Sequence, residues 1–249
     1  MKIGVGIVTY ERYDMFKKCI NSILKFRDKI DYLCVVDDCS QEQRDLYDSY
    51  FKELAMCGVK VFISDENRGV GHSKNKVLEY CFFKGCDYVF TIEDDMIILD
   101  GDVFKKYIEC SKNNNIHYLN YAHHGPANNG GPLFTDGDLE VYPHCVGSFS
   151  LHSKKLYKEV GYYDENYFNA WEHVDYYYMA SLKNLTTRFW YFADLAKSYN
   201  YIIEQPGSID ESSIRPRSDW KTNFEKGERF FLQKHKIALA DVPRWNEIY

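Results

Sequence analysis

Long hydrophobic runs are missing from this chain of 249 residues. No stretch approaches the roughly 20 consecutive apolar residues that a helix needs to cross a bilayer, so the sequence predicts no membrane-spanning segment. The opening residues, MKIGVGIVTY, place one lysine before a short apolar run, which is unlike a secretory signal. We therefore expect a cytoplasmic protein, with a peripheral association at the inner face of the membrane left open.

Basic blocks and paired cysteines are missing as well. The 31 Lys and Arg residues face 37 Asp and Glu residues, and the net charge of −6 argues against a protein dedicated to binding nucleic acid. The eight cysteines include no Cys-x-x-Cys pair and lie mostly in apolar segments, such as those around Cys34 and Cys81. This spacing argues against a zinc cluster and a disulfide framework, and it favours reduced, buried thiols.

Hydrophobic residues make up 45% of the chain, which is enough to build the core of one large domain or two small ones. In the first half, short apolar runs alternate with helical patterns. Strands are predicted at 3–8, 32–36, 59–64 and 88–92, and helices at 15–24, 46–54 and 75–83. Ser40 and Gln43 fit a capping box for the second helix. The alternation predicts an α/β fold around a mostly parallel, doubly wound sheet.

Three consecutive acids, Glu93, Asp94 and Asp95, separate two short apolar runs within residues 87–99. Carboxylates at the end of a buried strand are costly unless a cation meets them. Oxygen ligands favour Mg²⁺ or Mn²⁺, which commonly takes its remaining ligands from phosphates and water. A solvated acidic turn is the alternative interpretation.

Each of the four predicted strands is followed by a cluster of polar residues. These clusters lie at 9–11, 37–38, 67–71 and 93–95. In doubly wound sheets, ligands bind beyond the carboxyl ends of the strands, so these clusters should converge at one edge.

The second half has a less regular pattern. We expect a helix at 103–108, strands at 117–121, 140–151 and 187–192, a short helix capped by Ser153, a helix from about Glu172, and helical patterning at 224–249. Residues 122–139 are predicted to form one long loop. His123 and His124 lie in it and could bind a metal or an acceptor, although exposed loop histidines usually do neither.

Six short motifs occur in an order and spacing that resemble the glycosyltransferases of the GT-A fold, especially glycosyltransferase family 2, over roughly residues 3 to 200. The motifs are Thr9-Tyr10-Glu11-Arg12, Val36-Asp37-Asp38-Cys39-Ser40, Asn67-Arg68-Gly69, Ser73-Lys74-Asn75, Glu93-Asp94-Asp95, and Gly161-Tyr162-Tyr163-Asp164-Glu165 followed by Trp171-Glu172-His173-Val174-Asp175. The Glu-Asp-Asp form also looks like that of Golgi N-acetylglucosaminyltransferases, which use UDP-sugars.

The resemblance implies a metal-dependent inverting glycosyltransferase that moves a sugar from a nucleotide sugar, most simply a UDP-sugar, to a saccharide or glycan hydroxyl. The residues implied for the nucleotide are Thr9, Tyr10, Glu11, Asp38, Asn67, Gly69, Lys74, Glu93 and Asp94. Asp95, supported by Glu93, would bind Mn²⁺ or Mg²⁺ at the diphosphate. The catalytic base stays open among Glu172, His173 and Asp175, because His173 replaces the second acid that many relatives carry.

The resemblance also implies a single GT-A domain over residues 1–249. Residues 1–100 would bind the nucleotide sugar, 101–200 would hold the acceptor and catalytic residues, and 201–249 would form a C-terminal lid and helical tail. Arg215, Arg217 and Lys221 could close over the diphosphate, or belong to a solvated tail.

Two rival functions remain at this point. One is a non-catalytic nucleotide-sugar-binding scaffold, which the His173 departure keeps in view. The other is a sugar nucleotidyltransferase, although the chain lacks the early Gly-rich, basic phosphate loop that such chemistry needs.

Overall fold

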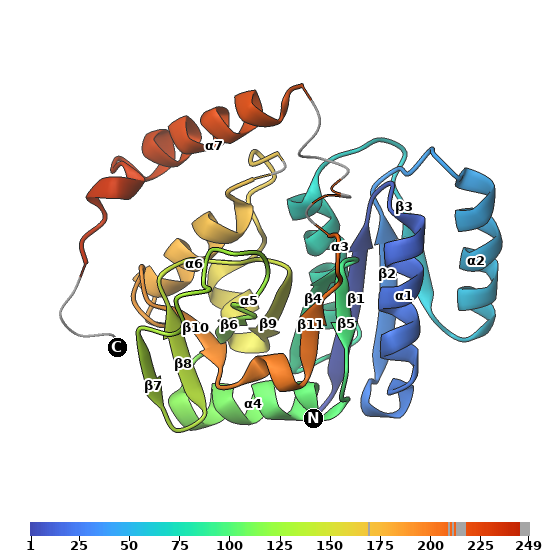
Figure 1. The fold of residues 1–249 in the computed structure, drawn as a ribbon, viewed down its shortest axis with the longest axis horizontal. Coiled ribbons are helices and arrows are strands. Elements are labelled where there is room, and N and C mark those ends of the chain that lie inside the picture. Colours follow the sequence, from blue (N-terminus) through green and yellow to red (C-terminus); the bar gives the residue numbers. More distant parts are fainter. Residues whose placement is uncertain (169, 209, 211, 213–217, 245–249) are drawn as a thin grey trace.

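A six-stranded sheet with the strand order β3-β2-β1-β4-β9-β6 forms the centre of the computed structural model, which describes residues 1–168, 170–208, 210, 212 and 218–244 (Figure 1). Its strands are β1 (Ile3–Thr9), β2 (Tyr32–Asp37), β3 (Lys60–Ile63), β4 (Tyr88–Glu93), β6 (Tyr118–Asn120) and β9 (Phe149–Ser153). The first four are mutually parallel, and β9 runs antiparallel between β4 and β6. The mostly parallel sheet expected from the sequence is confirmed.

Strand β1 lies between β2 and β4, and their registers bring the strand ends together. Thr9 pairs with Asp37, and Val8 pairs with Glu93. The chain leaves β1 toward β2 and later returns to the other side of β1 as β4, so the strand order reverses there. Such a reversal opens a crevice at the carboxyl edge of the sheet.

Helices cover both faces of this sheet. They are α1 (Tyr13–Leu24), α2 (Arg44–Met56), α3 (Val70–Phe83), α4 (Asp102–Asn114), α5 (Lys154–Val160) and α6 (Glu172–Leu182). Side chains of α1, α2 and α4 join one apolar core, and those of α3, α5 and α6 join the other. Helix α3 approaches β1 so closely that a Cβ on Gly6 would lie 2.2 Å from Val77 Cγ1, so only glycine fits there.

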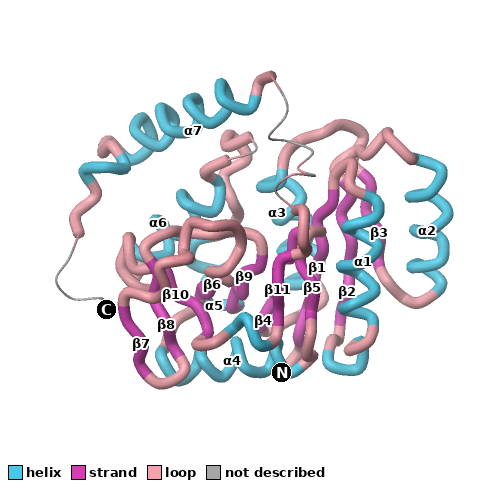
Figure 2. The backbone as a smooth tube through the Cα atoms, viewed as in Figure 1, coloured by secondary structure: helices cyan, strands magenta, loops and turns pink. Residues whose placement is uncertain are grey.

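Two smaller sheets flank the main one (Figure 2). An antiparallel sheet, ordered β10-β8-β7, contains β7 (Phe134–Asp136), β8 (Leu139–Tyr142) and β10 (Phe192–Leu195). A two-stranded sheet pairs β5 (Met96–Ile98) with β11 (Ile202–Glu204), which places Glu204 opposite Met96. The second pairing joins a late segment of the chain directly to the acidic turn that ends β4.

Helix α7 (Trp220–His235) lies above the start of α6 in the view of Figure 1. Phe231 is fully buried in the same core as α6. The helical patterning expected over 224–249 is found only in part among the described residues: α7 ends at His235, and it packs back on the domain. None of the described helices is both long and apolar enough to cross a membrane.

Several expected boundaries were wrong. The strand expected at 187–192 is β10, which begins only at Phe192, because the Thr187 hydroxyl donates to the Tyr191 carbonyl in a local turn. The capping box does not form: Ser40 Oγ accepts from the Glu11 N–H, and Gln43 precedes α2 with φ +56°. The expected loop at 122–139 includes β7.

Candidate active site

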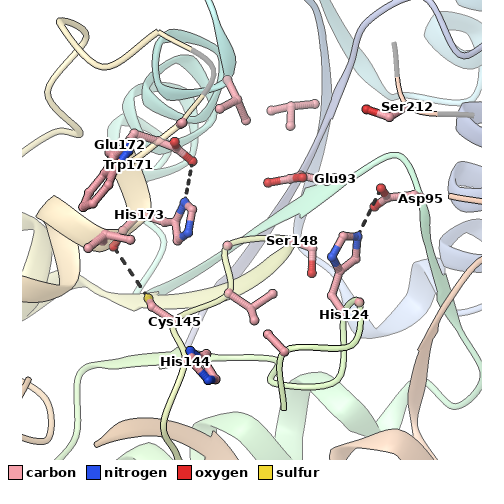
Figure 3. Close-up of a pocket in the computed structure, with 18 of the residues that line it drawn as sticks. Glu93, Asp95, His124, His144, Cys145, Ser148, Trp171, Glu172, His173 and Ser212 are labelled. Atoms are coloured by element: carbon pink, nitrogen blue, oxygen red, sulfur yellow. Dashed lines mark hydrogen bonds and ion pairs between the residues drawn. The ribbon is translucent and has the colours of Figure 1, made fainter. Parts of the chain in front are cut away.

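A cavity of about 610 Å³ lies at the carboxyl edge of the sheet. One wall comes from the ends of β1, β2 and β4, and the opposite wall comes from the start of α6, the segment before β10, and α7. The lining residues of the first wall include Thr9, Tyr10, Arg12, Asp38, Asn67, Glu93, Asp94 and Asp95. Figure 3 shows Glu172 and His173 on one side and Asp95 and His124 on the other, with Glu93 and Ser148 between them.

The acidic turn after β4 is neutralised by Arg12, which directly precedes α1. Arg12 Nη1 lies 3.1 Å from Asp95 Oδ2, and its Nη2 donates to Asp94. Asp94 also accepts from the Thr9 hydroxyl at 2.7 Å. Burial raises the pKa of Asp94, while the charge of Arg12 opposes that shift.

His124 and Gln205 also contact the acidic turn. His124 Nε2 lies 3.2 Å from Asp95 Oδ2 and 3.3 Å from Glu204 Oε1. The Gln205 amide donates to the Asp94 carbonyl at 2.9 Å. Burial alone would raise the pKa of Asp95, but the hydrogen bond and charge of His124 and the charge of Arg12 outweigh it and lower that pKa.

Lys74 connects the acidic turn to the opposite wall, although it does not line the cavity. Its Nζ donates to Glu93 Oε1 at 2.8 Å and to the Gly147 carbonyl at 2.9 Å, and it lies 3.4 Å from Glu172 Oε1. The Lys74 side chain has no exposed surface. Burial would lower its pKa, but the charges of Glu93 and Glu172 outweigh burial and raise it, so Lys74 is a buried cation shared by two acids.

Glu172 and His173 form a pair on the opposite wall (Figure 3). His173 Nδ1 lies 3.1 Å from Glu172 Oε1. Trp171, just before them, has φ +76°, a strained conformation for a bulky residue and one typical of functional sites. Burial would raise the pKa of Glu172, but the charges of His173 and Lys74 outweigh it and lower the pKa to about 2. Glu172 is therefore ionised at neutral pH.

Some of the expected nucleotide-binding residues line the cavity, and the others lie outside its lining. Thr9, Tyr10, Asp38 and Asn67 line the cavity, with Glu93 and Asp94. Gly69 acts through its backbone: the N–H groups of Arg68 and Gly69 donate to the two Asp38 oxygens at 3.0 and 2.7 Å. Glu11 does not line the cavity, because its carboxylate accepts from the Gln41 and Glu42 N–H groups.

Asp175 also lies away from the cavity lining. Its Oδ1 contacts His235 Nε2 at 2.6 Å and accepts from the Tyr167 hydroxyl at 3.0 Å, and its Oδ2 accepts from Lys234 at 2.8 Å. The carboxylate therefore joins α6 to α7. Of the three residues considered as the base, only Glu172 and His173 line the cavity.

Unpartnered polar atoms gather around this cavity. Six lining residues contain a buried side-chain polar atom with no hydrogen-bond partner among the described residues: Arg12 Nε, Asn67 Oδ1, Ser73 Oγ, Asp95 Oδ1, Ser148 Oγ and Trp171 Nε1. Because buried polar atoms are nearly always paired in native proteins, their concentration here indicates a cavity built for a polar ligand.

Among the described residues, no group of three or more His, Cys, Asp or Glu side chains is arranged to hold a metal ion alone. Asp95 Oδ1 is nevertheless a buried carboxylate oxygen without a partner, on the cavity wall. Mg²⁺ and Mn²⁺ are often bound by one or two carboxylates plus substrate phosphates and water. The residues therefore fit an ion shared with a phosphate ligand.

Two residues of the site were assigned no role from the sequence: Arg12 was noted only as part of a motif, and Gln205 was not singled out. For His124, binding of a metal or an acceptor was considered beside an exposed loop position without a role. The residues of the Gln205–Asp94 hydrogen bond are 111 positions apart in the chain, so no local pattern signals it. Arg215 and Arg217 lie outside the described residues.

Solved structures with a similar fold include glycosyltransferases. Residues 1–349 of S. aureus TarS align with a TM-score of 0.58 and 17% identity, covering 96% of this chain and 66% of that one. The same fragment in complex with UDP-GlcNAc aligns with a TM-score of 0.56 and 18% identity, covering 96% of this chain and 68% of that one. The mannosyltransferase PcManGT from Pyrobaculum calidifontis, in complex with GDP-Man and Mn²⁺, aligns with a TM-score of 0.51 and 15% identity. This alignment covers 66% of the present chain and 48% of the mannosyltransferase. At these identities the likeness shows the GT-A fold.

The alignments thus cover just under two thirds of the first TarS structure and about half of the mannosyltransferase. No match is found among curated protein sequences. Residues 4–133, however, match the sequence profile of Glycosyl transferase family 2. That match covers more than half of the chain and contains the ends of β1, β2 and β4, so the protein belongs to glycosyl transferase family 2.

Proposed function

We propose that this protein is a metal-dependent, inverting glycosyltransferase that transfers a sugar from a UDP-sugar to a saccharide hydroxyl. One observation carries the proposal: an acidic turn and the ionised Glu172, with His173 beside it, face each other across one cavity that contains buried polar atoms without a hydrogen-bond partner among the described residues. The UDP-GlcNAc complex of TarS and the GDP-Man and Mn²⁺ complex of PcManGT support a nucleotide-sugar donor and a divalent ion.

The donor would lie along the ends of β1, β2 and β4. Thr9, Tyr10, Asp38 and Asn67 would contact the nucleoside, and Asp94 and Asp95 would face the ribose and the diphosphate. Residues 1–100 then serve the donor, residues 101–200 supply the acceptor side, and residues 201–249 close the cavity through α7. Glu11, Gly69 and Lys74 support this site from behind its wall.

Charge separation is the main barrier in this reaction. The sugar carbon becomes positive, while the departing diphosphate becomes negative. Asp95, with Glu93 beside it, would hold Mn²⁺ or Mg²⁺, which supplies Lewis-acid stabilisation of the leaving group when bound. Lys74 contacts both Glu93 and Glu172, and so it fixes the positions of the two carboxylates relative to each other.

The acceptor hydroxyl must lose a proton on the face opposite the diphosphate. The Glu172–His173 pair faces that space, and we assign it this role. A positioned base is worth about 10²–10⁴-fold in rate. In-line attack from this side inverts the anomeric carbon.

Aromatic side chains form the wall beyond this pair. Trp171, Trp190, Trp220 and Phe224 line the cavity, and Trp171 Nε1 is buried with no hydrogen-bond partner in the described part of the chain. An aromatic face next to an unused N–H donor suits a sugar ring, which offers both an apolar face and hydroxyl acceptors. This wall supports a saccharide acceptor.

Thermal-shift measurements with UDP, GDP and their sugars, with and without Mn²⁺, test the proposal, because a ligand of the native state raises apparent stability. We expect stabilisation by UDP that depends on Mn²⁺, slow hydrolysis of at least one UDP-sugar, and loss of the Mn²⁺ effect in Asp95→Asn. Metal-independent UDP binding would contradict the metal assignment. Donor binding without hydrolysis or transfer would favour a non-catalytic scaffold.

A further inference from the structure

Arg12 occupies both carboxylates of the acidic turn in this structure. Its two terminal nitrogens divide between Asp94 and Asp95, so one guanidinium bridges two neighbouring acids. Its side chain is 15% exposed and lines the cavity. Arg12 therefore lies where the proposed function requires a divalent ion and a diphosphate to enter.

This pairing leaves polar atoms unused on both sides. Arg12 Nε and Asp95 Oδ1 are both buried and have no hydrogen-bond partner among the described residues. Buried guanidinium and carboxylate groups are normally fully hydrogen-bonded, since an unsatisfied charged group is expensive. The Arg12–Asp94–Asp95 contacts therefore pair the charges but leave hydrogen-bonding atoms of Arg12 and Asp95 unused. Such an arrangement suits a state in which Arg12 exchanges one binding partner for another.

The backbone around Arg12 is held independently of that pairing. The Arg12 N–H donates to the Tyr47 hydroxyl at 3.0 Å, and the preceding Glu11 anchors the N–H groups of Gln41 and Glu42. The long side chain can therefore leave the acids by rotating, while the chain at the start of α1 stays in place.

We propose that Arg12 is a partner-switching cation: it holds Asp94 and Asp95 in the free protein, and it turns to the diphosphate when the donor and its divalent ion enter. The inference rests on the proposed function. A divalent ion at Asp95 and a guanidinium a few ångströms away repel each other, so the ion displaces Arg12 from Asp95. A diphosphate then offers Arg12 the planar, bidentate acceptor that guanidinium groups favour.

The switch predicts opposite effects on two ligands. Without Arg12, Mn²⁺ no longer competes with a guanidinium for the two carboxylates and binds more tightly by itself, while the His124 contact to Asp95 is the same in both proteins. The diphosphate loses its cationic partner, so UDP binds more weakly even when Mn²⁺ is saturating. An arginine with a purely structural role would instead move both affinities in the same direction.

The test uses Arg12→Gln in the full chain. Electron paramagnetic resonance of free Mn²⁺ gives the affinity for the ion alone, and titration calorimetry at saturating Mn²⁺ gives the affinity for UDP. We expect Mn²⁺ to bind at least about tenfold more tightly and UDP at least about tenfold more weakly than in the wild type. Arg44→Gln is the matched control, because Arg44 pairs with the buried Asp37 at 2.7 Å but neither residue lines the cavity. It should leave both affinities unchanged.

Weaker or unchanged Mn²⁺ binding in Arg12→Gln, or unchanged UDP binding, would overturn the switch. If Arg12→Gln does not fold, Arg12→Lys replaces it: a shorter side chain with one nitrogen lacks the planar fork that Arg12 divides between Asp94 and Asp95, so the same two opposite shifts are expected at smaller size. A wild-type protein that binds neither Mn²⁺ nor UDP would contradict the proposed function itself, which separates the two failures.

Discussion

At the scale of single residues, Lys74 has the most consequential position. It is a fully buried cation between two acids that belong to opposite walls of the cavity. Its removal would leave the Glu93 and Glu172 carboxylates facing each other without their shared cation, and with the His173 ring 3.1 Å from Glu172. Breaking a buried ion pair by deleting one partner is far more damaging than the pair's net stabilisation suggests.

We therefore expect Lys74→Met to lower the free energy of unfolding by about 3–5 kcal/mol, measured by urea denaturation. Lys76→Met is the control, because Lys76 pairs with Glu79 on the exposed face of the same helix. It should change stability by no more than about 0.5 kcal/mol. A loss below about 1 kcal/mol for Lys74→Met would mean that the two acids find another counter-charge.

The Glu172–His173 pair makes a separate kinetic prediction. If the two side chains act as one proton acceptor, Glu172→Gln and His173→Gln should each lower kcat by about 10²–10⁴-fold. The double variant should be no slower than the slower single variant, because groups acting as a unit are strongly non-additive. Single-turnover transfer rates measure this, with circular dichroism confirming the fold. Losses that multiply would show that the residues act independently.

At the scale of elements, helix α7 forms part of the cavity wall and packs closely against Trp171. A Cβ on Gly227 would lie 2.6 Å from Trp171 Cδ1. Lys234 and His235, farther along α7, both contact Asp175. The helix thus supports the strained turn that presents Glu172.

Gly227→Ala tests this packing, because the expected change in stability is opposite to the usual effect of replacing a helical glycine with alanine. Alanine normally stabilises a helix relative to glycine by about 1 kcal/mol. Here the methyl group would push α7 from Trp171, and we expect a loss of about 1–3 kcal/mol, as for other overpacked sites. Faster proteolysis within α7 should accompany it. Gly71→Ala is the control in α3, since its nearest contact would be an ordinary 3.5 Å to Glu172 Cβ. Stabilisation by Gly227→Ala would contradict the close packing.

At the scale of the whole molecule, the cavity acids make stability depend on pH. The pKa of Glu172 falls from 4.5 to about 2 in the folded protein, because His173 and Lys74 outweigh the effect of burial. The folded state thus favours the ionised form. Its contribution is complete above the unfolded pKa and is lost as pH falls toward the folded pKa.

We expect the wild type to be more stable than Glu172→Gln at neutral pH and this difference to shrink from about pH 4.5 toward about pH 2. Urea unfolding across that range measures it. A difference that stays constant down to the lowest pH would show that the Glu172 carboxylate is not selectively stabilised in the fold.

Much of the donor side could be predicted from the sequence. Short apolar runs located β1, β2, β3 and β4, and the polar residues after them had to meet because parallel strands share a carboxyl edge. The order of six motifs indicated the family, which the match over residues 4–133 confirms. Boundaries in the second half were less predictable, since short antiparallel strands such as β7 and β10 give little periodic signal.

The amino-acid sequence by itself therefore determined the sheet and the acids along its edge, because both depend on local periodicity and on the rule that parallel strands end together. Only the tertiary structure decided which side chains face the cavity. Glu172 and Asp175 are three residues apart at the start of one helix, yet packing against α7 takes Asp175 away and leaves Glu172 at the site. Arg12, His124 and Gln205 reach the acidic turn from distant parts of the chain, and such contacts follow from how layers pack.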